Sequence, residues 1–515
     1  MALLAMLVEN FGKIVLSTLA AFLSYLLCYA IYNIYFHPLS HVPGPILWTS
    51  TRLRYLLSIW SGYLHTDIQD LHRKYGQIIR VAPDEVSFAV PDAWSQIYSN
   101  TSGTPAFPKS KLWHGAAPGR PMSVLNALDP KVHARFRKAM DPAFTEKAVR
   151  AQEPVIQTRV ALFISQLDKL VAAAKENEGV IVNIVRWLAF VTFDVVGDLG
   201  FGETFGCLET SEYHPWVSMI FTSLRAATYR ASLRYYPQLS PLMGFLAVPK
   251  SVMQQQIQHW KQSVDKINRR LASEKERPDL ISMMKRDDDG VDGITTAELQ
   301  ATTSVLIVAG SETTVSVLSG TTNYLVKNPD KLALLAEEVR RACNTERDIT
   351  LSAFKDLPYL NAVLQEGLRL CNPTPVGAPR VTPPGGATVC GTWLPGETFV
   401  NVHPLALNRS PVMFHDPNAF HPERWLSSAP PAFSEDKKNA VQAFGVGPRS
   451  CIGRPLAWAE LRLILGRLVW RFDLQEADTE AGRLDWQSQR VFSVVERKPF
   501  EVRLKLRQGL APIHA

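Results

Sequence analysis

The sequence predicts a mainly α-helical fold with a small β portion, preceded by one N-terminal transmembrane helix. Three observations support this prediction: an apolar stretch over residues 14–36, long helical patterns over residues 130–330, and a Pro/Gly-rich segment with β-branched residues over 372–395. The 515 residues are 46% hydrophobic and 20% charged. This composition is typical of a globular interior and excludes a disordered or polytopic membrane protein.

The first element is a single uncleaved membrane anchor over residues 14–36, which follows a short N-terminal tail of residues 1–13. The stretch contains no charged residue, and as a helix it reaches about 34 Å, enough for a hydrocarbon core of roughly 30 Å. A cleaved signal peptide is the alternative, but its apolar region would be only about 7–15 residues. Bulky Tyr35 and Phe36 also stand where small residues would precede a cleavage site.

Residues 37–45 contain three prolines and are predicted to form a hinge, because proline ends a helix and stiffens the chain. Two arginines follow the apolar stretch, whereas one acidic and one basic residue cancel before it. The positive-inside rule therefore places the remaining residues, 46–515, in the cytoplasm. No linker divides them, so they are predicted to form a single domain.

The domain is predicted to begin with a hairpin over residues 77–90, where polar and apolar residues alternate around a Pro83-Asp84 turn. Helices are predicted over residues 129–140, 153–175, 183–199, 295–327 and 456–472. The helix over 295–327 is largely apolar and would be some 50 Å long, so we expect it to cross the interior. Short strands and turns are expected over 372–395, and a Gly/Pro/Arg loop over 445–455.

Charge and cysteine content narrow the possible partners and the compartment of the protein. The net charge of +7 is mild and scattered, so it fits an acidic protein partner or an anionic membrane and gives no indication of nucleic-acid binding. The six cysteines lie far apart and form no CxxC pair. A disulfide scaffold is therefore excluded, and a reducing compartment is expected.

The segment Phe444-Gly-Val-Gly-Pro-Arg-Ser-Cys-Ile-Gly453 carries the strongest chemical signal. Glycines allow a backbone to turn tightly and approach a flat ligand, and a helix N-terminus favours an anion, so Cys451 can be held as a thiolate. Such a thiolate is a suitable axial ligand for haem iron, and Arg449 could pair with a haem propionate. A buried structural cysteine in a Gly-rich turn is the alternative.

At these residues the chain resembles the cytochrome P-450 family of haem-thiolate monooxygenases, whose signature Phe-x-x-Gly-x-Arg-x-Cys-x-Gly is matched completely. The resemblance continues in family order over almost the whole chain, and the stretches LHRKYGQIIRVAPDEVSF and FDVVGDLGFGETF look most like filamentous-fungal members of secondary metabolism. It implies the cytochrome P-450 fold for residues 46–515 and haem b as the cofactor. It also implies Cys451 as the iron ligand, with Phe444 and Arg449 as haem contacts.

Glu366 and Arg369 lie one helical turn apart, a spacing that recurs at four other Glu/Arg pairs and by itself indicates only solvated surface ion pairs. Their position before the Pro-rich strand region and before the segment Phe-His-Pro-Glu-Arg424-Trp distinguishes them. The resemblance implies that Arg424 joins Glu366 and Arg369 in a buried network that holds the haem loop. Bidentate arginine–carboxylate contacts suit this task.

His133 and Arg137 lie on one face of a helix, where a basic solvated surface is the alternative to an anion site. The resemblance implies that this helix runs beside the haem, so Arg137 and His133 are expected to contact the propionates. His133 stands where the family more often has tryptophan. Arg380, after Pro379 in the strand region, is a third expected propionate partner by the same resemblance.

The long apolar helix contains Ala309-Gly-Ser-Glu312-Thr313-Thr314 at its middle, where a glycine and polar groups are costly. A packing glycine with a threonine bonded back to its own helix is the alternative. The segment resembles the family's oxygen-site pattern. This implies that Thr313 positions a hydroxyl near the oxygen and that Glu312 relays protons from solvent.

These features predict a single-pass enzyme of the endoplasmic reticulum membrane that inserts one oxygen atom of dioxygen into an apolar organic substrate, by hydroxylation, epoxidation or a related oxidation. No nicotinamide or flavin domain is visible, so electrons from NADPH are expected through NADPH–cytochrome P-450 reductase, with cytochrome b5 as a further candidate partner. A haem-thiolate isomerase or dehydratase that needs no reductant is one alternative, against which the Glu312-Thr313 pair weighs. A non-enzymatic haem-binding protein is another, and the oxygen-site helix argues against it.

Overall fold

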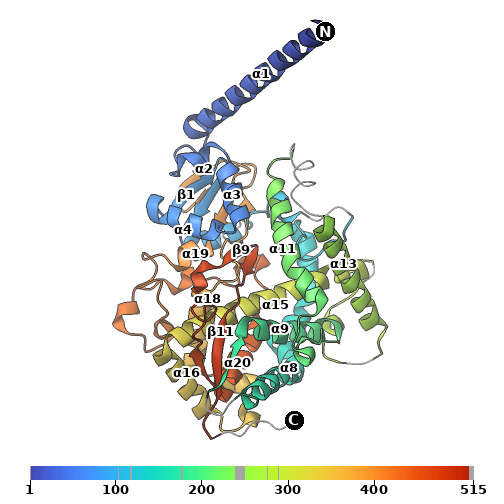
Figure 1. Ribbon diagram of the computed structural model, residues 1–515, viewed down its shortest axis with the longest axis vertical. Coiled ribbons are helices and arrows are strands. Elements are labelled where there is room, and N and C mark those ends of the chain that lie inside the picture. Colours follow the sequence, from blue (N-terminus) through green and yellow to red (C-terminus); the bar gives the residue numbers. More distant parts are fainter. Residues whose placement is uncertain are drawn as a thin grey trace.

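Two parts of unequal size follow an isolated N-terminal helix: a smaller β-containing part next to that helix, and a larger helical part beyond it (Figure 1). This computed structural model describes residues 2–101, 104–115, 119–174, 178–237, 250–274, 277–287 and 289–509. It confirms the predicted fold class, a mainly helical domain with small sheets.

The helices of the N-terminal half are α1 (Ala2–Ile31), α2 (Ile46–Ser50), α3 (Leu53–Ser61), α4 (Leu64–Tyr75), α5 (Asp92–Tyr98), α6 (Lys111–His114), α7 (Pro130–Phe144), α8 (Glu146–Ala172), α9 (Ile184–Phe201), α10 (Cys207–Thr210) and α11 (Pro215–Leu233). Those of the C-terminal half are α13 (Lys250–Ala272), α14 (Leu280–Met283), α15 (Thr296–Lys327), α16 (Pro329–Ala342), α17 (Leu351–Lys355), α18 (Pro358–Leu370), α19 (Pro404–Asn408) and α20 (Arg454–Arg471). Each long helix predicted from the sequence is present, with ends shifted by a few residues.

The strands form four small sheets. They are β1 (Ile78–Ala82), β2 (Glu85–Phe88), β3 (Val180–Asn183), β4 (Arg380–Val381), β5 (Ala387–Val389), β6 (Thr392–Leu394), β7 (Phe399–Val402), β8 (Phe472–Glu476), β9 (Arg490–Phe492), β10 (Val494–Glu496) and β11 (Glu501–Leu506). Their orders are β1-β2-β7-β4, β3-β11-β8, β5-β6 and β9-β10. The predicted hairpin over residues 77–90 is the antiparallel pair β1-β2.

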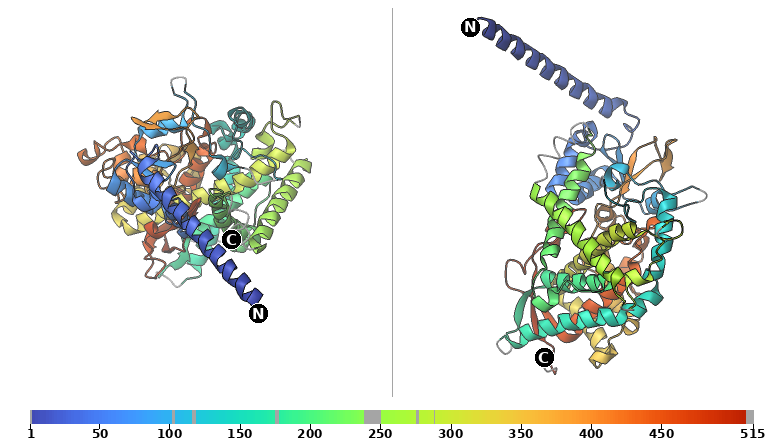
Figure 2. Two further views of the ribbon diagram at one scale, coloured as in Figure 1. Left: turned by 90° about the horizontal axis from the view of Figure 1, so that it is seen from above. Right: turned by 90° about the vertical axis from the view of Figure 1, so that its right-hand side faces the viewer.

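Helix α1 stands clear of the rest of the chain in Figure 1 and in the right-hand view of Figure 2. The stretch Asn10–Phe36 is apolar and long enough to cross a membrane. The helix begins at Ala2, so most of the residues expected to form a separate tail belong to it. A π-helical turn, Tyr32–Phe36, ends it before the first proline.

The junction between the N-terminal helix and the domain is packed onto the domain. Asn33, predicted to lie in the membrane, is instead buried against the domain. Its side-chain amide donates to Ser50 O over 2.8 Å, and its backbone carbonyl accepts from Arg80 Nη1 over 2.7 Å. Leu39 and Val42 of the Pro-rich segment are also buried, against the core of the small sheet. The last turn of the helix and the segment 37–45 therefore pack onto the domain.

A chain of hydrogen bonds ties α4 to the first sheet. His72 Nδ1 donates to Gly76 O over 2.9 Å, so its Nε2 accepts from Ser87 Oγ at 2.7 Å. Ser87 Oγ in turn accepts from His403 Nδ1 at 2.7 Å. Both imidazoles are buried, and burial lowers the pKa of His72 to about 4 and that of His403 to about 3. The two rings are therefore neutral in the folded protein at neutral pH.

Helix α15 crosses the larger part, as expected, and packs mainly against α9, α18 and α13 (Figure 1). It begins with a capping box in which Thr295 accepts from Glu298 N and Glu298 accepts from Thr295 N. The capping box satisfies two N–H groups that the first helical turn leaves unpaired. Most of its 32 residues are buried, and its buried leucines, isoleucine and valines belong to the main hydrophobic core. The cap and the buried side chains therefore hold α15 in one position. Its central polar segment lies against the neighbouring elements.

Candidate active site

The loop before α20 presents Cys451 in a tight backbone turn. Cys451 N donates to Phe444 O over 2.8 Å, and both Gly445 and Gly447 have positive φ angles. A Cβ atom on Gly447 would lie 2.1 Å from Tyr98 O, so only glycine fits there. The Cys451 side chain is accessible, although the elements beside it belong to the core. Protein atoms do not fill the space next to the thiol, as expected for a ligand site.

Opposing effects act on the pKa of Cys451. Burial of the thiol from bulk water raises its pKa, while the N–H groups of Gly453 and Arg454 and the cations of Arg137 and Arg454 lower it. Burial is the largest of these effects, and the N–H groups and cations around the thiol favour the thiolate, as expected from the sequence. A coordinated metal ion deprotonates a thiol outright.

Basic side chains gather beside this loop. Arg449, Arg380 and His133 were predicted from the sequence, and the structure adds Lys109 and His114, which the sequence analysis missed. Burial and then the neighbouring cations lower the pKa of Lys109 to about 7, that of His133 to about 3 and that of Arg449 to about 10. The same causes hold the pKa of His114 well below its usual value. Buried basic groups that lie this close together form a favourable environment for an anion.

Backbone contacts place these side chains. Arg449 donates to Ala127 O and Leu128 O at 2.8 and 2.7 Å, and Lys109 Nζ donates to Leu125 O at 2.7 Å. Lys109 also forms a β-bridge with Arg380. The helix α7, the segment before α6 and strand β4 therefore converge on the loop that carries Cys451.

Arg137, expected from the sequence to contact a propionate, also contacts the cysteine loop itself. Its Nη1 donates to Ser450 O over 2.8 Å, and its Nε lies 3.5 Å from Asp141 Oδ1. It therefore holds the backbone directly before Cys451, while His133, one turn earlier on α7, faces the basic cluster. Phe444 packs against Trp458 of α20, with 6.3 Å between the centroids of the two rings.

These residues fit a haem group. Arg380 Nε and Nη1 and His114 Nε2 are buried without a hydrogen-bond acceptor, and no carboxylate pairs with the cluster among the residues that the structure describes. Buried cations are normally paired, so the cluster requires an anion of its own. A planar group with two carboxylates and an iron that takes a thiolate would satisfy Arg380, Arg449, His114 and Cys451 together.

The centre of α15 combines the two features expected there. Ala309 is accessible and Thr313 half-buried, whereas the turns that follow are buried. Thr313 Oγ donates to Ala309 O over 2.7 Å, and a Cβ on Gly310 would lie 3.0 Å from Val196 of α9. Gly310 therefore packs closely against α9, and Thr313 bonds back to its own helix, as the purely structural interpretation of this segment expects. The open surface over Ala309 and Thr313 nevertheless leaves room for small molecules on that face.

Glu312 lies on another face of the same helix. It is buried, and its Oε2 accepts from Arg497 Nη2 over 2.8 Å. Burial raises the pKa of Glu312, and Arg497 acts in the opposite direction. The sequence analysis did not identify Arg497, because the residue lies far along the chain in a segment without a motif.

The predicted network around Glu366 is present. Arg424 Nε donates to Glu366 Oε1 at 3.2 Å, and Arg369 binds the same carboxylate. The three side chains are fully buried. Burial alone would raise the pKa of Glu366, but the two arginines outweigh it and lower the pKa. Arg424 also pairs with buried Asp436, which the sequence analysis missed.

Comparisons with known proteins agree with this site. A family model described as Cytochrome P450 matches residues 38–502. Cytochrome P450 monooxygenase lcsI of Purpureocillium lilacinum is 40% identical over 495 residues, which are 95% of this chain and 94% of the relative. Cytochrome P450 monooxygenase efuB of Hormonema carpetanum is 38% identical over 510 residues, which are 98% and 99% of the two chains.

A solved structure shows the same fold. The crystal structure of the cytochrome P450DA heme domain superposes with a TM-score of 0.73 and covers 91% of this chain and 98% of its own, at 17% identity. The family resemblance inferred from the motifs is thus confirmed by both sequence and fold. The chain belongs to the cytochrome P450 family and is one of its monooxygenases.

Proposed function

We propose that this monooxygenase oxidises an apolar small molecule of fungal secondary metabolism, at the endoplasmic reticulum membrane, with electrons from NADPH supplied by NADPH–cytochrome P450 reductase. Its similar relatives are fungal monooxygenases that match almost the full chain. The apolar stretch Asn10–Phe36 supports a membrane location, and the positive-inside rule supports a cytoplasmic domain. Cytochrome b5 is a second candidate electron donor.

The observation that carries the proposal is the accessible Cys451 beside an unpaired basic cluster. Cys451 would bind haem iron, and Arg380, Arg449, His133, Lys109 and His114 would hold the propionates. Haem bound in this way supplies the reductive activation of dioxygen and the transfer of one oxygen atom. Phe444 would shield the thiolate side from water.

The protein itself must deliver protons on the opposite face. Thr313 has a half-buried hydroxyl that donates to Ala309 O, and its lone pairs remain able to accept from a water molecule. Glu312, on the adjoining face of α15, is the nearest acid in sequence. We assign Thr313 to holding that water and Glu312 to supplying its proton.

Metabolite profiling of a strain that lacks this chain would identify the substrate, as the compound that accumulates. Purified holoenzyme with reductase, NADPH and ¹⁸O₂ should then convert that compound to a product carrying one ¹⁸O atom. Conversion without NADPH and without label would instead show a haem-thiolate isomerase or dehydratase. Absence of any conversion by haem-loaded protein would overturn the enzymatic assignment.

A further inference from the structure

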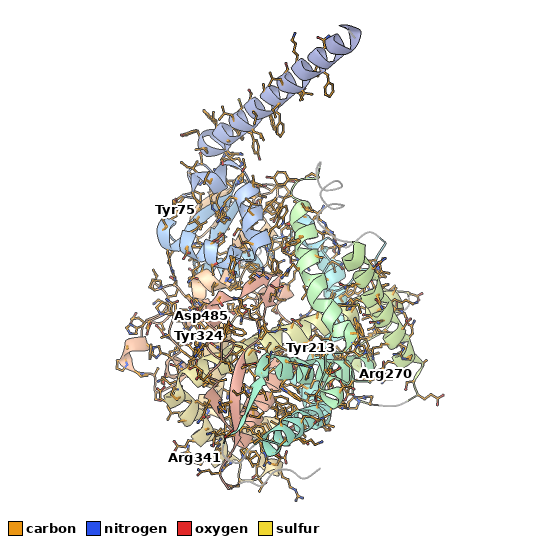
Figure 3. All side chains as sticks on the ribbon, viewed as in Figure 1. Tyr75, Tyr213, Arg270, Tyr324, Arg341 and Asp485 are labelled. Carbon is orange, nitrogen blue, oxygen red and sulfur yellow. The ribbon has the colours of Figure 1, made fainter. Side chains whose placement is uncertain are left out.

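A pocket of about 180 Å³ lies beside the centre of α15, at Glu312. Its lining includes Tyr213, Arg225, Glu312, Phe492, Glu496 and Arg497, from the segment before α11, from α11, from α15 and from the β9-β10 hairpin with the residue after it. Tyr213, labelled in Figure 3, marks its position beside α9 and α15. Glu312 is the residue of α15 in this lining, so the pocket connects with that helix through a carboxylate.

Arg497 binds α15 at three points. Besides the contact of its Nη2 with Glu312 Oε2, its Nη1 donates to Glu312 O and to Ser316 Oγ, both over 3.0 Å. The Arg497 and Glu312 side chains are 3% and 1% exposed, so this ion pair is screened little by solvent. The arginine therefore fixes both the backbone and the carboxylate of Glu312.

The second carboxylate oxygen remains available. Glu312 Oε1 is buried and has no hydrogen-bond donor among the residues that the structure describes. An unsatisfied buried carboxylate oxygen is costly unless a water molecule or a proton reaches it. A pocket of this size has room for several water molecules beside it.

The outer part of the pocket is polar and partly exposed. Arg225 and Glu496 form an ion pair there, with side chains 39% and 36% exposed, and Arg490 pairs with the same glutamate over 3.0 Å. Tyr213 lies further in, and burial raises its pKa to about 12. Among the residues that the structure describes, the titratable groups that line this pocket beside Glu312 are thus two arginines, one phenol and one glutamate, and Arg497 donates to its carboxylate.

We propose that Arg497 is a positioning residue that sets the orientation and proton affinity of Glu312, and that this pocket is the route by which protons reach Glu312 from solvent. The proposal rests on the proposed role of Glu312 in proton supply. In each transfer a water in the pocket gives a proton to Glu312 Oε1, and the carboxylic acid then gives a proton to the water held by Thr313. No group is oxidised or reduced in this relay.

The test uses haem-loaded Arg497→Met, Arg497→Lys and, as a matched control, Arg490→Met, which removes a partly exposed arginine from the same hairpin. Without the cation, Glu312 should bind its proton more tightly, so a carboxylic acid C=O band should appear in the infrared spectrum of Arg497→Met at pH 7. Arg497→Met/Glu312→Gln should lack that band. The inflection in the pH dependence of product formed per NADPH should rise by about one to three pH units in Arg497→Met. Arg497→Lys should restore most of the wild-type value, and Arg490→Met should match the wild type.

A second variant tests the route independently of the ion pair. Val494→Trp would fill the pocket, and it should lower product per NADPH while leaving the infrared band absent. The proposal would be overturned if Arg497→Met showed neither a new carboxylic acid band nor a shifted inflection in the pH dependence of product per NADPH. Wild-type product per NADPH in Val494→Trp would overturn it as well. If Glu312→Gln alone retained normal coupling, the proposed relay itself would fail, which separates the two hypotheses.

Discussion

Arg369 donates to both carboxylate oxygens of Glu366, with Nε 2.8 Å from Oε2 and Nη2 2.6 Å from Oε1, and neither side chain is accessible to solvent. The remaining acceptor capacity of Glu366 is also filled, by His421 N at 2.9 Å and Trp425 Nε1 at 2.8 Å. The carboxylate therefore joins α18 to the segment that leads into the cysteine loop.

Replacement of Glu366 should destabilise the fold strongly. Glu366→Ala leaves two buried guanidinium groups without their shared anion, which should cost about 3–5 kcal/mol and reduce haem retention. Glu337 has the same spacing from an arginine but is exposed, and that arginine, Arg340, pairs with Asp473 instead. Glu337→Ala should therefore cost less than about 1 kcal/mol. Urea unfolding of the three proteins measures the difference, and equal costs would contradict the structural role.

The identity of the iron ligand can be tested spectroscopically. Reduced protein with carbon monoxide should show the absorption of thiolate-ligated haem, and Cys451→Ala should abolish it. Cys390→Ala, at a half-buried cysteine in the β5-β6 turn, should keep the spectrum. A thiolate spectrum in Cys451→Ala would mean that another cysteine binds the iron.

The hydroxyl of Thr313 should matter for coupling and little for folding. Thr313→Ala should bind substrate and carbon monoxide normally, yet release hydrogen peroxide and form less product per NADPH, because water is no longer held on that face. Thr322 on the same helix bonds back to Leu318 O over 2.8 Å and is buried. Thr322→Ala removes the same type of bond and should leave coupling unchanged. Normal coupling in Thr313→Ala would make Thr313 a packing residue.

The anchor should be removable only up to the π-helical turn. Deletion of residues 2–31 should release the protein from membranes and retain haem. Deletion through Phe36 also removes Asn33, so Arg80 Nη1 loses its buried acceptor, at a cost of about 1–3 kcal/mol. Sedimentation with membranes and thermal unfolding distinguish the two deletions. Equal stability of both would show that the Asn33 contacts are dispensable.

The free energy of unfolding should fall as the pH is lowered from 6.5 towards 4. His72 and His403 have folded pKa values of about 4 and about 3, below an unfolded value of about 6.5, so only the unfolded chain binds protons in this range. Each histidine contributes about 1.4 kcal/mol per pH unit there, and its contribution is complete above pH 6.5. Urea unfolding from pH 8 to 5 should show a shallower slope for His72→Gln/His403→Gln than for the wild type. Identical slopes would exclude these two histidines as the cause.

Residues that belong to local motifs were predictable from the sequence, and residues that depend on tertiary contacts were not. Cys451 and Arg449 lie in a short motif that already indicates their surroundings, and Glu366 was distinguished from four similar pairs by its position in the chain and by the family resemblance. Lys109 and Arg497 have no such pattern, because each reaches its site from a segment brought there only by the folded chain. Hydrophobicity alone also placed Asn33 wrongly, in the membrane-spanning segment. A single amide in an apolar stretch does not show whether it will find hydrogen-bond partners in the folded domain.

Strand β11 is the last strand among the residues that the structure describes, and it pairs with β3 on one side and β8 on the other. A ribosome that adds about 5–20 residues per second needs roughly 15–65 s to pass from Asn183 to Glu501. During that interval β3 has no partner strand, while α1 has already emerged. Completion of the domain is therefore a late event, which takes place after the whole apolar N-terminal helix has been synthesised.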